Sequence, residues 1–492
     1  MTTNPNCAVE SLAIYVPSSE KPWEINRIQH LYRRLGYGAE IAKIGAAQTK
    51  SPSRLVDELI EGAMTARLPN TPEWATWDFP KFEQKASSEE EREDLINEAI
   101  YGWLRTWIKD MMAQGVRGKM VLFWHNHFVT QLETFYFPRY LYDYHRLLQE
   151  MAFGNFKEFV SEMGKNTAML FFLNGVESNK YEPNENYARE LYELFTLGRD
   201  NSYTQTDIEE TARALTGWNN LASWGSPITF NDFLWDKREK TIFGQTGTWG
   251  YNDVHDILFE ERKDQIARFI CQKIYTHFVN PLPNEFIINQ LADTFKNNDW
   301  KIAPVMKQLF KSEHFFDEKN IGVLVKSPYD LFLNFFQEVG GYEPDEEGLG
   351  GLHYFTGMLG QELSSPIDVA GWRGNRSWID TARITGRWRI MGWIIYGVMD
   401  QQPEKLTELA IQLVGSQGEN DPALVTQKVV DFFLAAELHT PEIYERATEV
   451  FKVEIPSNYF DDGQWNLYWD TIPWQMTSLL QYLAKIPEFQ LT

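Results

Sequence analysis

The spacing of apolar residues restricts the fold of this chain more than any other feature of its sequence. In the segment 183–198, Tyr187, Leu191, Leu194 and Phe195 recur at i, i+4, i+7 and i+8, which is the stripe of an amphipathic helix. The same spacing recurs along most of the chain, and the alternating pattern of strands is scarce. We therefore predict an all-α fold, a large single multi-helical domain with a few long Trp- and Gly-rich loops and minimal strand.

Three regions follow from where the helical spacing begins and weakens. Residues 1–24 carry little periodicity and are predicted to form an N-terminal tail. Residues 25–340 are predicted to form the main helical domain, and residues 341–492 a C-terminal helical part packed on the first. The boundary lies at the acidic, Gly-rich loop 340–351, the nearest feature to a linker. The one long non-helical stretch, 219–250, is typical of a short hairpin or a functional insertion.

The chain is strongly acidic, which limits its partners. It has 69 Asp and Glu against 46 Lys and Arg in 492 residues, a net charge of −23. A nucleic-acid-binding surface needs basic patches, so we expect no nucleic acid partner, and an anionic membrane surface is disfavoured for the same reason. The sequence contains no run of about 18 apolar residues, so we predict no membrane span. Because no signal peptide is visible, the default expectation is a cytoplasmic protein.

Charged side chains crowd the start of the helix in 183–198. Glu185 and Glu190 are a carboxylate pair on adjacent turns, and such a pair can serve as acid and base in hydrolysis. Arg189 would then bind an anionic group or hold one carboxylate ionised. The alternative is a buried salt-bridge network that ties this helix to the next one through Arg213 or Asp207 and does no chemistry.

His125 and His127 are the best candidates for metal ligands. Imidazole nitrogens bind zinc, copper or iron readily, so the expected cofactor is a divalent metal. The spacing is awkward, because residues i and i+2 of a helix point about 200° apart and cannot face one ion. A strand or a helix end could present both. The alternative places one histidine in a hydrogen bond of the core and the other near the surface.

Aromatic residues exceed what core packing usually needs. The chain has 18 Trp, and 15% of its residues are Phe, Trp or Tyr. In the loop 371–378, Trp372 and Arg373 are predicted to bind a sugar or an anionic ligand by stacking and hydrogen bonding. Trp218 and Asp236 are further candidates for substrate binding. The alternative for the loop is a packed cap without a ligand.

Two functions fit these candidates. The first is a hydrolase that acts on a glycan or another polar polymer, with Glu185 and Glu190 as acid and base, Arg189 orienting them and a metal at His125 or His127. The second is a non-catalytic binding or assembly module. In that module the same residues hold helices together and the aromatic side chains form a partner surface.

Short motifs are spread along the chain at residues 31–38, 124–128, 183–191, 194–198, 203–204, 212–218, 326–328, 371–372 and 487–491. In combination they resemble the domain-of-unknown-function 1800 family, over nearly the whole chain. The resemblance implies a bacterial, mainly helical protein treated as one unit. It also implies a second, sulfatase-like uncharacterised protein as a partner, and many relatives carry export signals that this chain does not show.

The chain departs from the family pattern in one place. Relatives usually carry a His-Asp pair before a Lys-Thr turn, whereas this sequence has Trp235 in place of the histidine and retains Asp236. If that histidine is a ligand or a base in relatives, this protein has lost it, or His255 substitutes for it.

Overall fold

Helices make up most of the structure, which is a computed structural model that describes residues 9–435 and 441–492. The first helices, with two short 3-10 turns and one π-helical turn, are α1 Ile25–Leu35, α2 Ile41–Gln48, α3 Pro52–Thr65, η1 Glu73–Thr76, α4 Phe79–Lys85, α5 Glu89–Ala113, α6 Gly115–His127, α7 Leu132–Phe135, α8 Pro138–Met151, α9 Phe156–Lys165, α10 Thr167–Phe172, η2 Gly175–Glu177, α11 Asn186–Glu190 and η3 Leu191–Thr196. The middle of the chain forms α12 Gln205–Ala214, β1 Trp218–Asn220, β2 Thr229–Phe230, β3 Lys240–Ile242, β4 Gln245–Gly247, α13 Tyr251–Glu261, α14 Lys263–Phe278, α15 Glu285–Asn297, α16 Ile302–Lys311, η4 Glu318–Asn320 and α17 Pro328–Glu338. The last part forms α18 Glu346–Met358, η5 Asn375–Trp378, α19 Thr381–Gln401, α20 Pro403–Val414, α21 Pro422–Phe433, α22 Pro441–Lys452, α23 Ser457–Asp461, α24 Ile472–Leu483 and η6 Pro487–Gln490.

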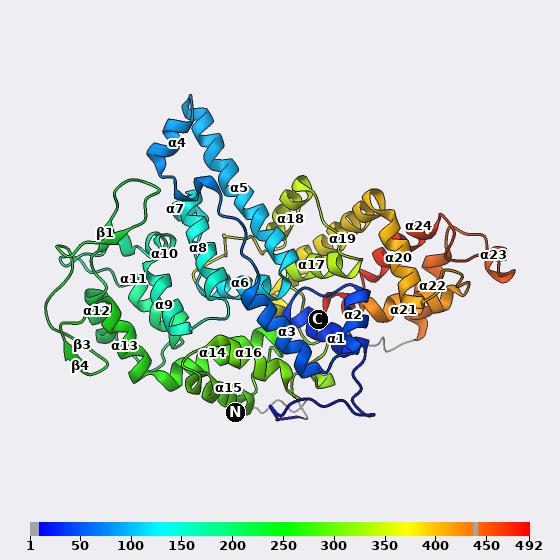
Figure 1. Cartoon of the computed structure of the whole chain (residues 1–492), viewed down its shortest axis with the longest axis horizontal. Helices are drawn as coiled ribbons and strands as arrows, with labels where there is room; N and C mark the ends of the chain where they lie inside the picture. Colours follow the sequence, from blue (N-terminus) through cyan, green and yellow to red (C-terminus); the bar gives the residue numbers. More distant parts are fainter. Residues whose placement is uncertain (1–8, 436–440) are drawn as a thin grey trace.

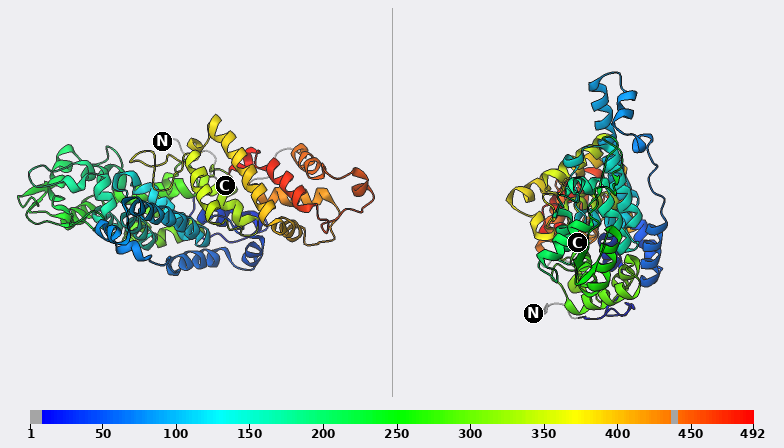
Figure 2. Two further views of the ribbon diagram at one scale, coloured as in Figure 1. Left: turned by 90° about the horizontal axis from the view of Figure 1, so that it is seen from above. Right: turned by 90° about the vertical axis from the view of Figure 1, so that its left-hand side faces the viewer.

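The strands form two small antiparallel hairpins in and beside the predicted non-helical stretch. β1 pairs with β2, with Trp218 opposite Phe230, and β3 pairs with β4, with Thr241 opposite Thr246. Both hairpins lie at one end of an elongated molecule, and α20–α24 form the other end (Figures 1 and 2). The prediction of an all-α fold with minimal strand is confirmed.

Helix α6 lies at the centre of the molecule, where it sets the position of the site described below. Ten of its thirteen residues are buried, including its cationic residues Arg117 and Lys119. A helix that is buried on all sides must be covered by neighbours, and α6 packs against α3, α5 and α8. Helix α17 begins at another wall of the site, with Ser327 as its cap and Pro328 in its first turn.

Helix α1 joins the two predicted parts of the chain. The Arg33 guanidinium forms an ion pair of 2.6 Å with Glu338 on α17, and both side chains are almost fully buried. Arg33 also donates to the carbonyl oxygen of Phe432 on α21, as does the amide of Gln29, each at 2.8 Å. The regions 25–340 and 341–492 are therefore linked by buried polar contacts that start from one helix.

The predicted N-terminal tail lies partly outside the described residues, because the structure describes it only from residue 9. Residues 9–24 contain no helix. They run along α16, where Ile14 pairs with Ser312 and the buried ring of Tyr15 packs 4.7 Å from that of Phe316, centre to centre. The described part of this segment is thus attached to the core. Among all the described helices, none has the length and apolarity needed to cross a membrane.

Candidate functional site

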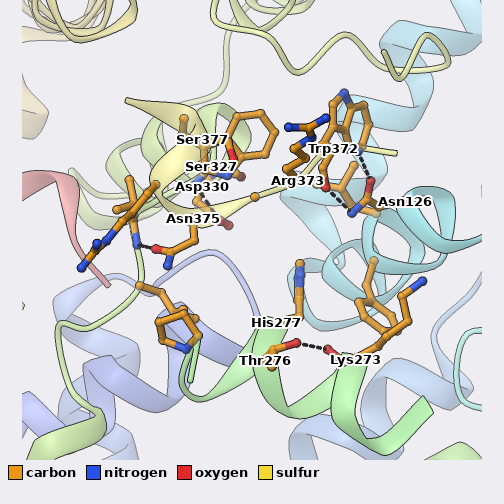
Figure 3. Close-up of a pocket in the computed structure, with 18 of the residues that line it drawn as sticks. Asn126, Lys273, Thr276, His277, Ser327, Asp330, Trp372, Arg373, Asn375 and Ser377 are labelled. Carbon is orange, nitrogen blue, oxygen red and sulfur yellow. Dashed lines mark hydrogen bonds between the residues drawn. The ribbon is translucent and has the colours of Figure 1, made fainter. Parts of the chain in front are cut away.

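A cavity of about 680 Å³ lies where α1, α6, α14 and α17 meet the loop 370–378. Figure 3 shows its walls: Lys273, Thr276 and His277 come from α14, and Asn126 comes from the end of α6. The loop contributes most of the opposite wall, including Trp372 and Arg373, which the sequence analysis selected. The cavity therefore combines two predicted motifs, the histidine segment of α6 and the Gly-Trp loop.

Asn126, the residue between the two predicted metal ligands, fastens the loop to α6. Its Nδ2 donates to the carbonyl oxygen of Trp372 at 3.1 Å, and its Oδ1 accepts from the backbone N–H of Trp372 at 2.6 Å. Gly371 has a φ of +80°, and a Cβ atom there would lie 2.3 Å from Asn126 Oδ1. Only glycine fits this position, because other residues rarely adopt a positive φ and because a Cβ atom would collide with the Asn126 amide.

His125 is a fully buried residue of the core. Its Nε2 accepts a hydrogen bond from the N–H of Ser364 at 3.1 Å, so its Nδ1 carries the proton and donates to the Tyr144 hydroxyl at 2.7 Å. The Tyr144 hydroxyl in turn donates a hydrogen bond to the carbonyl of Phe128. Burial lowers the pKa of His125 to about 3, so the ring is neutral at neutral pH.

His127 is also buried, and both of its ring nitrogens are occupied. Nε2 lies 3.0 Å from the carbonyl oxygen of Phe195, to which it donates, and Nδ1 accepts from the Lys273 ammonium at 2.9 Å. Phe195 lies in the π-helical turn η3, whose last carbonyls lack partners within the helix. Burial, and the charge of Lys273, hold the pKa of His127 well below its usual value.

These surroundings do not fit the predicted metal ion. His125 and His127 point to different partners, and all four ring nitrogens already form hydrogen bonds. Within residues 9–435 and 441–492, no group of three or more His, Cys, Asp or Glu side chains is placed to hold a metal. Neither histidine lies near the surface, so the alternative prediction of one exposed histidine does not describe this site either.

The charged side chains that line the cavity are mostly basic. Five of them are cationic, namely Arg34, Lys119, Lys273, Arg373 and Arg376, whereas Asp330 is the one acidic side chain. Burial favours the neutral acid, but the Lys119 ammonium beside Asp330 outweighs burial and keeps the pKa of this carboxyl below its usual value. His277 also faces the cavity, and its side chain is exposed there.

Arg34 is the most unusual of these groups. Its side chain is buried, at 2% exposure, and Nη2 donates to the carbonyl of Asn320 at 3.0 Å. Nε and Nη1 have no hydrogen-bond partner. Burial lowers the pKa of Arg34 to about 9, although the charge of Asp330 opposes the shift. A buried guanidinium with two unpaired nitrogens is costly unless a ligand completes it.

The predicted Glu/Arg helix lies elsewhere, and none of its residues lines the cavity. Arg189 pairs with Glu185 at 2.9 Å, and both bond to the amide of Gln205, at the start of α12, at 2.9 Å. The link between the two helices therefore runs through Gln205. Arg213 instead pairs with Asp236, and Asp207 caps α12.

Glu190 is half-buried and separate from that triangle of hydrogen bonds. Burial and the neighbouring Glu193 carboxylate raise its pKa, and the charges of Arg199 and Arg189 only partly oppose them. The structure does not bring Glu190 and the cavity together.

Asp236 and Trp218 form parts of packed structure near the hairpins. Burial favours protonation of Asp236, but hydrogen bonds from Arg238 and Arg213 outweigh it and hold the pKa of the carboxyl far below its usual range. The ring of Trp218 packs at 5.6 Å from Phe230 and 5.5 Å from Tyr251, centre to centre. Neither residue lines the cavity.

Trp235, at the position where the family pattern is expected to carry histidine, is also part of packed structure. The Lys240 ammonium lies over the ring of Trp235, 5.4 Å from the ring centre, in a cation–π contact. His255 is buried, and its Nδ1 lies 2.9 Å from the carbonyl oxygen of Tyr251 in its own helix.

One comparison with known proteins gave a match. The family model described as "Protein of unknown function (DUF1800)" matches residues 30–491. The chain belongs to the DUF1800 family. Comparisons with curated proteins and with solved structures returned no match. The match to DUF1800 confirms the resemblance expected from the motifs, and the matched region contains all the basic side chains of the cavity.

The sequence analysis of this DUF1800 protein missed several residues of the cavity. Arg34 and Ser327 lie in motifs 31–38 and 326–328, so the family motifs were a signal for them. Lys273 and His277 lie in a segment with ordinary helical spacing, and nothing local distinguishes them from solvent-facing residues.

Proposed function

We propose that this DUF1800 protein binds a polar anionic ligand in the central cavity. The observation that carries the proposal is the Arg34 guanidinium, which is buried at the cavity wall with two of its nitrogens unpaired. Hydrogen bonds from a guanidinium to a carboxylate, phosphate or sulfate group are short and strong, and a dry site strengthens them further. Because the whole chain carries a net charge of −23, a cavity whose charged side chains are mostly basic is a local exception.

The rest of the cavity fits a ligand of modest size. Its volume of about 680 Å³ lies in the range of small-molecule sites. Arg373 and Arg376 are exposed at the loop, and neither forms an ion pair with a described acidic residue. Asn375 and Ser377 add hydrogen-bonding groups. Trp372 is only 4% exposed, so its ring supports the wall and offers little open surface for stacking.

A hydrolase that uses Glu185 and Glu190 is the second candidate. The raised pKa of Glu190 favours it, because a higher pKa brings a carboxyl closer to the range in which general acids work. The hydrogen-bonded triangle of Glu185, Arg189 and Gln205 favours the alternative, a binding or assembly module with a structural network. The sulfatase-like partner implied by the family resemblance stays a prediction.

Calorimetric titration with inorganic sulfate, inorganic phosphate and a sugar acid, at low ionic strength, tests the anion site. We expect at least one of them to bind, and binding to weaken as NaCl is added. Arg34→Met removes charge-assisted hydrogen bonds of about 1.5–3 kcal/mol each, so affinity should fall by roughly 10-fold or more.

Because Arg34→Met can also destabilise the fold, the exposed pair Arg373→Gln and Arg376→Gln provides a second test. Together they should weaken binding by roughly 3- to 10-fold, which corresponds to about 1 kcal/mol for exposed charges. Arg389→Gln is the matched control, since Arg389 is an exposed arginine that does not line this cavity. Absence of binding to all three anions, or binding that none of the cavity variants changes, would refute the proposal.

A further inference from the structure

Lys273 differs from Lys119, the other lysine of the cavity, in the groups that hold it. Its Nζ lies 2.9 Å from His127 Nδ1 and 3.5 Å from the carbonyl oxygen of Leu194. His127 Nε2 donates to the carbonyl of Phe195, so Nδ1 has a lone pair and accepts from Lys273. The amine is therefore held by neutral acceptors, and no described acidic side chain forms an ion pair with it.

The contrast with Lys119 defines the special position of Lys273. Lys119 lines the same cavity and is paired with the Asp330 carboxylate, which favours its charged form and partly offsets the lowering of its pKa by burial. Lys273 has no such counter-ion, and burial lowers its pKa to about 8. With that pKa, roughly 10% of the amine is neutral at pH 7, against less than about 0.1% for an ordinary lysine with a pKa near 10.4.

We propose that Lys273 is a nucleophilic amine that forms an imine with the carbonyl group of an anionic aldehyde or keto acid held in the cavity. This inference rests on the proposed anion-binding function. The neighbouring guanidinium groups would hold the acid group of the ligand, and Lys273, on the wall formed by α14, would meet its carbonyl carbon (Figure 3).

The step needs no oxidant or reductant. The neutral Nζ attacks the carbonyl carbon, a C–N bond forms, and the carbonyl oxygen becomes a hydroxyl group by taking up a proton. His127 Nδ1, already in contact with Nζ, is the nearest acceptor for the proton that nitrogen loses. That proton then leaves with the hydroxyl group as water while the nitrogen lone pair forms the C=N bond. The product is the protonated imine, whose positive charge balances the proton that the carbonyl oxygen took up from solvent.

Borohydride trapping with pyridoxal 5′-phosphate, an anionic aldehyde, tests the proposal on the full chain. Reduction converts an imine into a stable secondary amine, which peptide mass spectrometry locates. At pH 7 we expect labelling of Lys273 on the order of 100-fold faster than labelling of exposed lysines, because of its larger neutral fraction. The rate should rise with pH, reach half of its maximum near pH 8 and level off above that pH. Lys119 should stay unlabelled and serves as an internal control.

Two comparisons separate this proposal from anion binding itself. Lys273→Arg keeps a positive charge, so it should still bind sulfate while the label disappears. Uncharged pyridoxal should label Lys273 at least 10-fold more slowly than its phosphate ester.

If sulfate binds but Lys273 labels no faster than surface lysines, the nucleophilic role is wrong and the anion site stands. If both aldehydes label Lys273 equally and sulfate does not bind, the anion site is wrong. Should the arginine variant fail to fold, the label map and the pH profile of the unmodified chain decide.

Discussion

Replacing Asn126 by alanine should release the loop 370–378 from helix α6. The amide of Asn126 both donates to and accepts from the backbone of Trp372, which is 4% exposed. Alanine removes both hydrogen bonds and leaves a buried N–H and a buried C=O without partners. The loop is part of the cavity wall, so the same change tests how the site is held in place.

The size of the effect follows from the two bonds. A buried backbone group left without its partner costs about 1–3 kcal/mol, so the two together make opening of the loop easier by about 2–6 kcal/mol. Since 1.4 kcal/mol corresponds to tenfold, exchange of the Trp372 amide hydrogen should accelerate by roughly 30-fold to 20,000-fold. Asn126→Asp keeps the acceptor for the Trp372 N–H and loses the donor, so it should give a smaller acceleration.

Hydrogen–deuterium exchange measured on peptides that cover residues 366–380 provides the assay. Gly371→Ala should accelerate exchange as well, because its Cβ would lie 2.3 Å from Asn126 Oδ1. Asn298→Ala is the matched control, since Asn298 is an exposed asparagine with one bond of 2.8 Å to the carbonyl of Thr294. Exchange at Trp372 that changes less than about threefold in Asn126→Ala would show that other contacts hold the loop.

Three further predictions concern stability. Glu338→Gln should lower the free energy of unfolding by about 3–5 kcal/mol in urea denaturation, because it leaves the charge of Arg33 buried without its partner; a loss below about 1 kcal/mol would contradict this. His145 stacks on Trp107 with both ring nitrogens unpaired, and burial holds its pKa well below 6.5. The neutral ring therefore costs no stability above about pH 6.5. Below that pH the unfolded chain takes up a proton that the folded protein does not, so the free energy of unfolding falls by about 1.4 kcal/mol per pH unit. His145→Phe should remove that share, so unfolding curves of both proteins at pH 7 and pH 5 should differ in pH dependence by about 2 kcal/mol; parallel dependence would refute it. The pKa of Glu190 is raised in the folded protein, so its charged form destabilises the fold at pH 7. Glu190→Gln should therefore keep or slightly increase thermal stability at pH 7, and the gain should vanish below about pH 4.5. A loss of several kcal/mol would instead assign Glu190 a structural role.

Helical spacing predicted the fold because each helix must bury one stripe. In the segment 183–198, Tyr187, Leu191 and Phe195 are buried as the stripe requires. The sequence did not predict that this segment changes from the α-helix α11 to the π-helical turn η3. The spacing of apolar residues does not distinguish a π-helical turn from an α-helix. In this turn the carbonyl of Phe195 accepts a hydrogen bond from His127.

The candidate site was predictable only in part. The segment 124–128 and the loop at 371–372 were selected from residue types, and the structure brings them together. Their chemistry differs from the expectation because it depends on distant residues. Ser364 and Lys273 occupy the ring nitrogens that a metal would need, and Arg34 comes from the first helix. None of these pairings has a local signal in the sequence.

The contacts of α1 also determine when the chain can finish folding. Gln29 and Arg33 donate to the carbonyl of Phe432, about 400 residues later. At a synthesis rate of about 5–20 residues per second, a nascent chain carries α1 for roughly 20–80 s before that partner is made. During this time the polar side chains on the buried face of α1 are without their partners, on a helix too short to be stable alone. We expect full-length chains to depend on a chaperone at the ribosome, and chains truncated before residue 432 to aggregate.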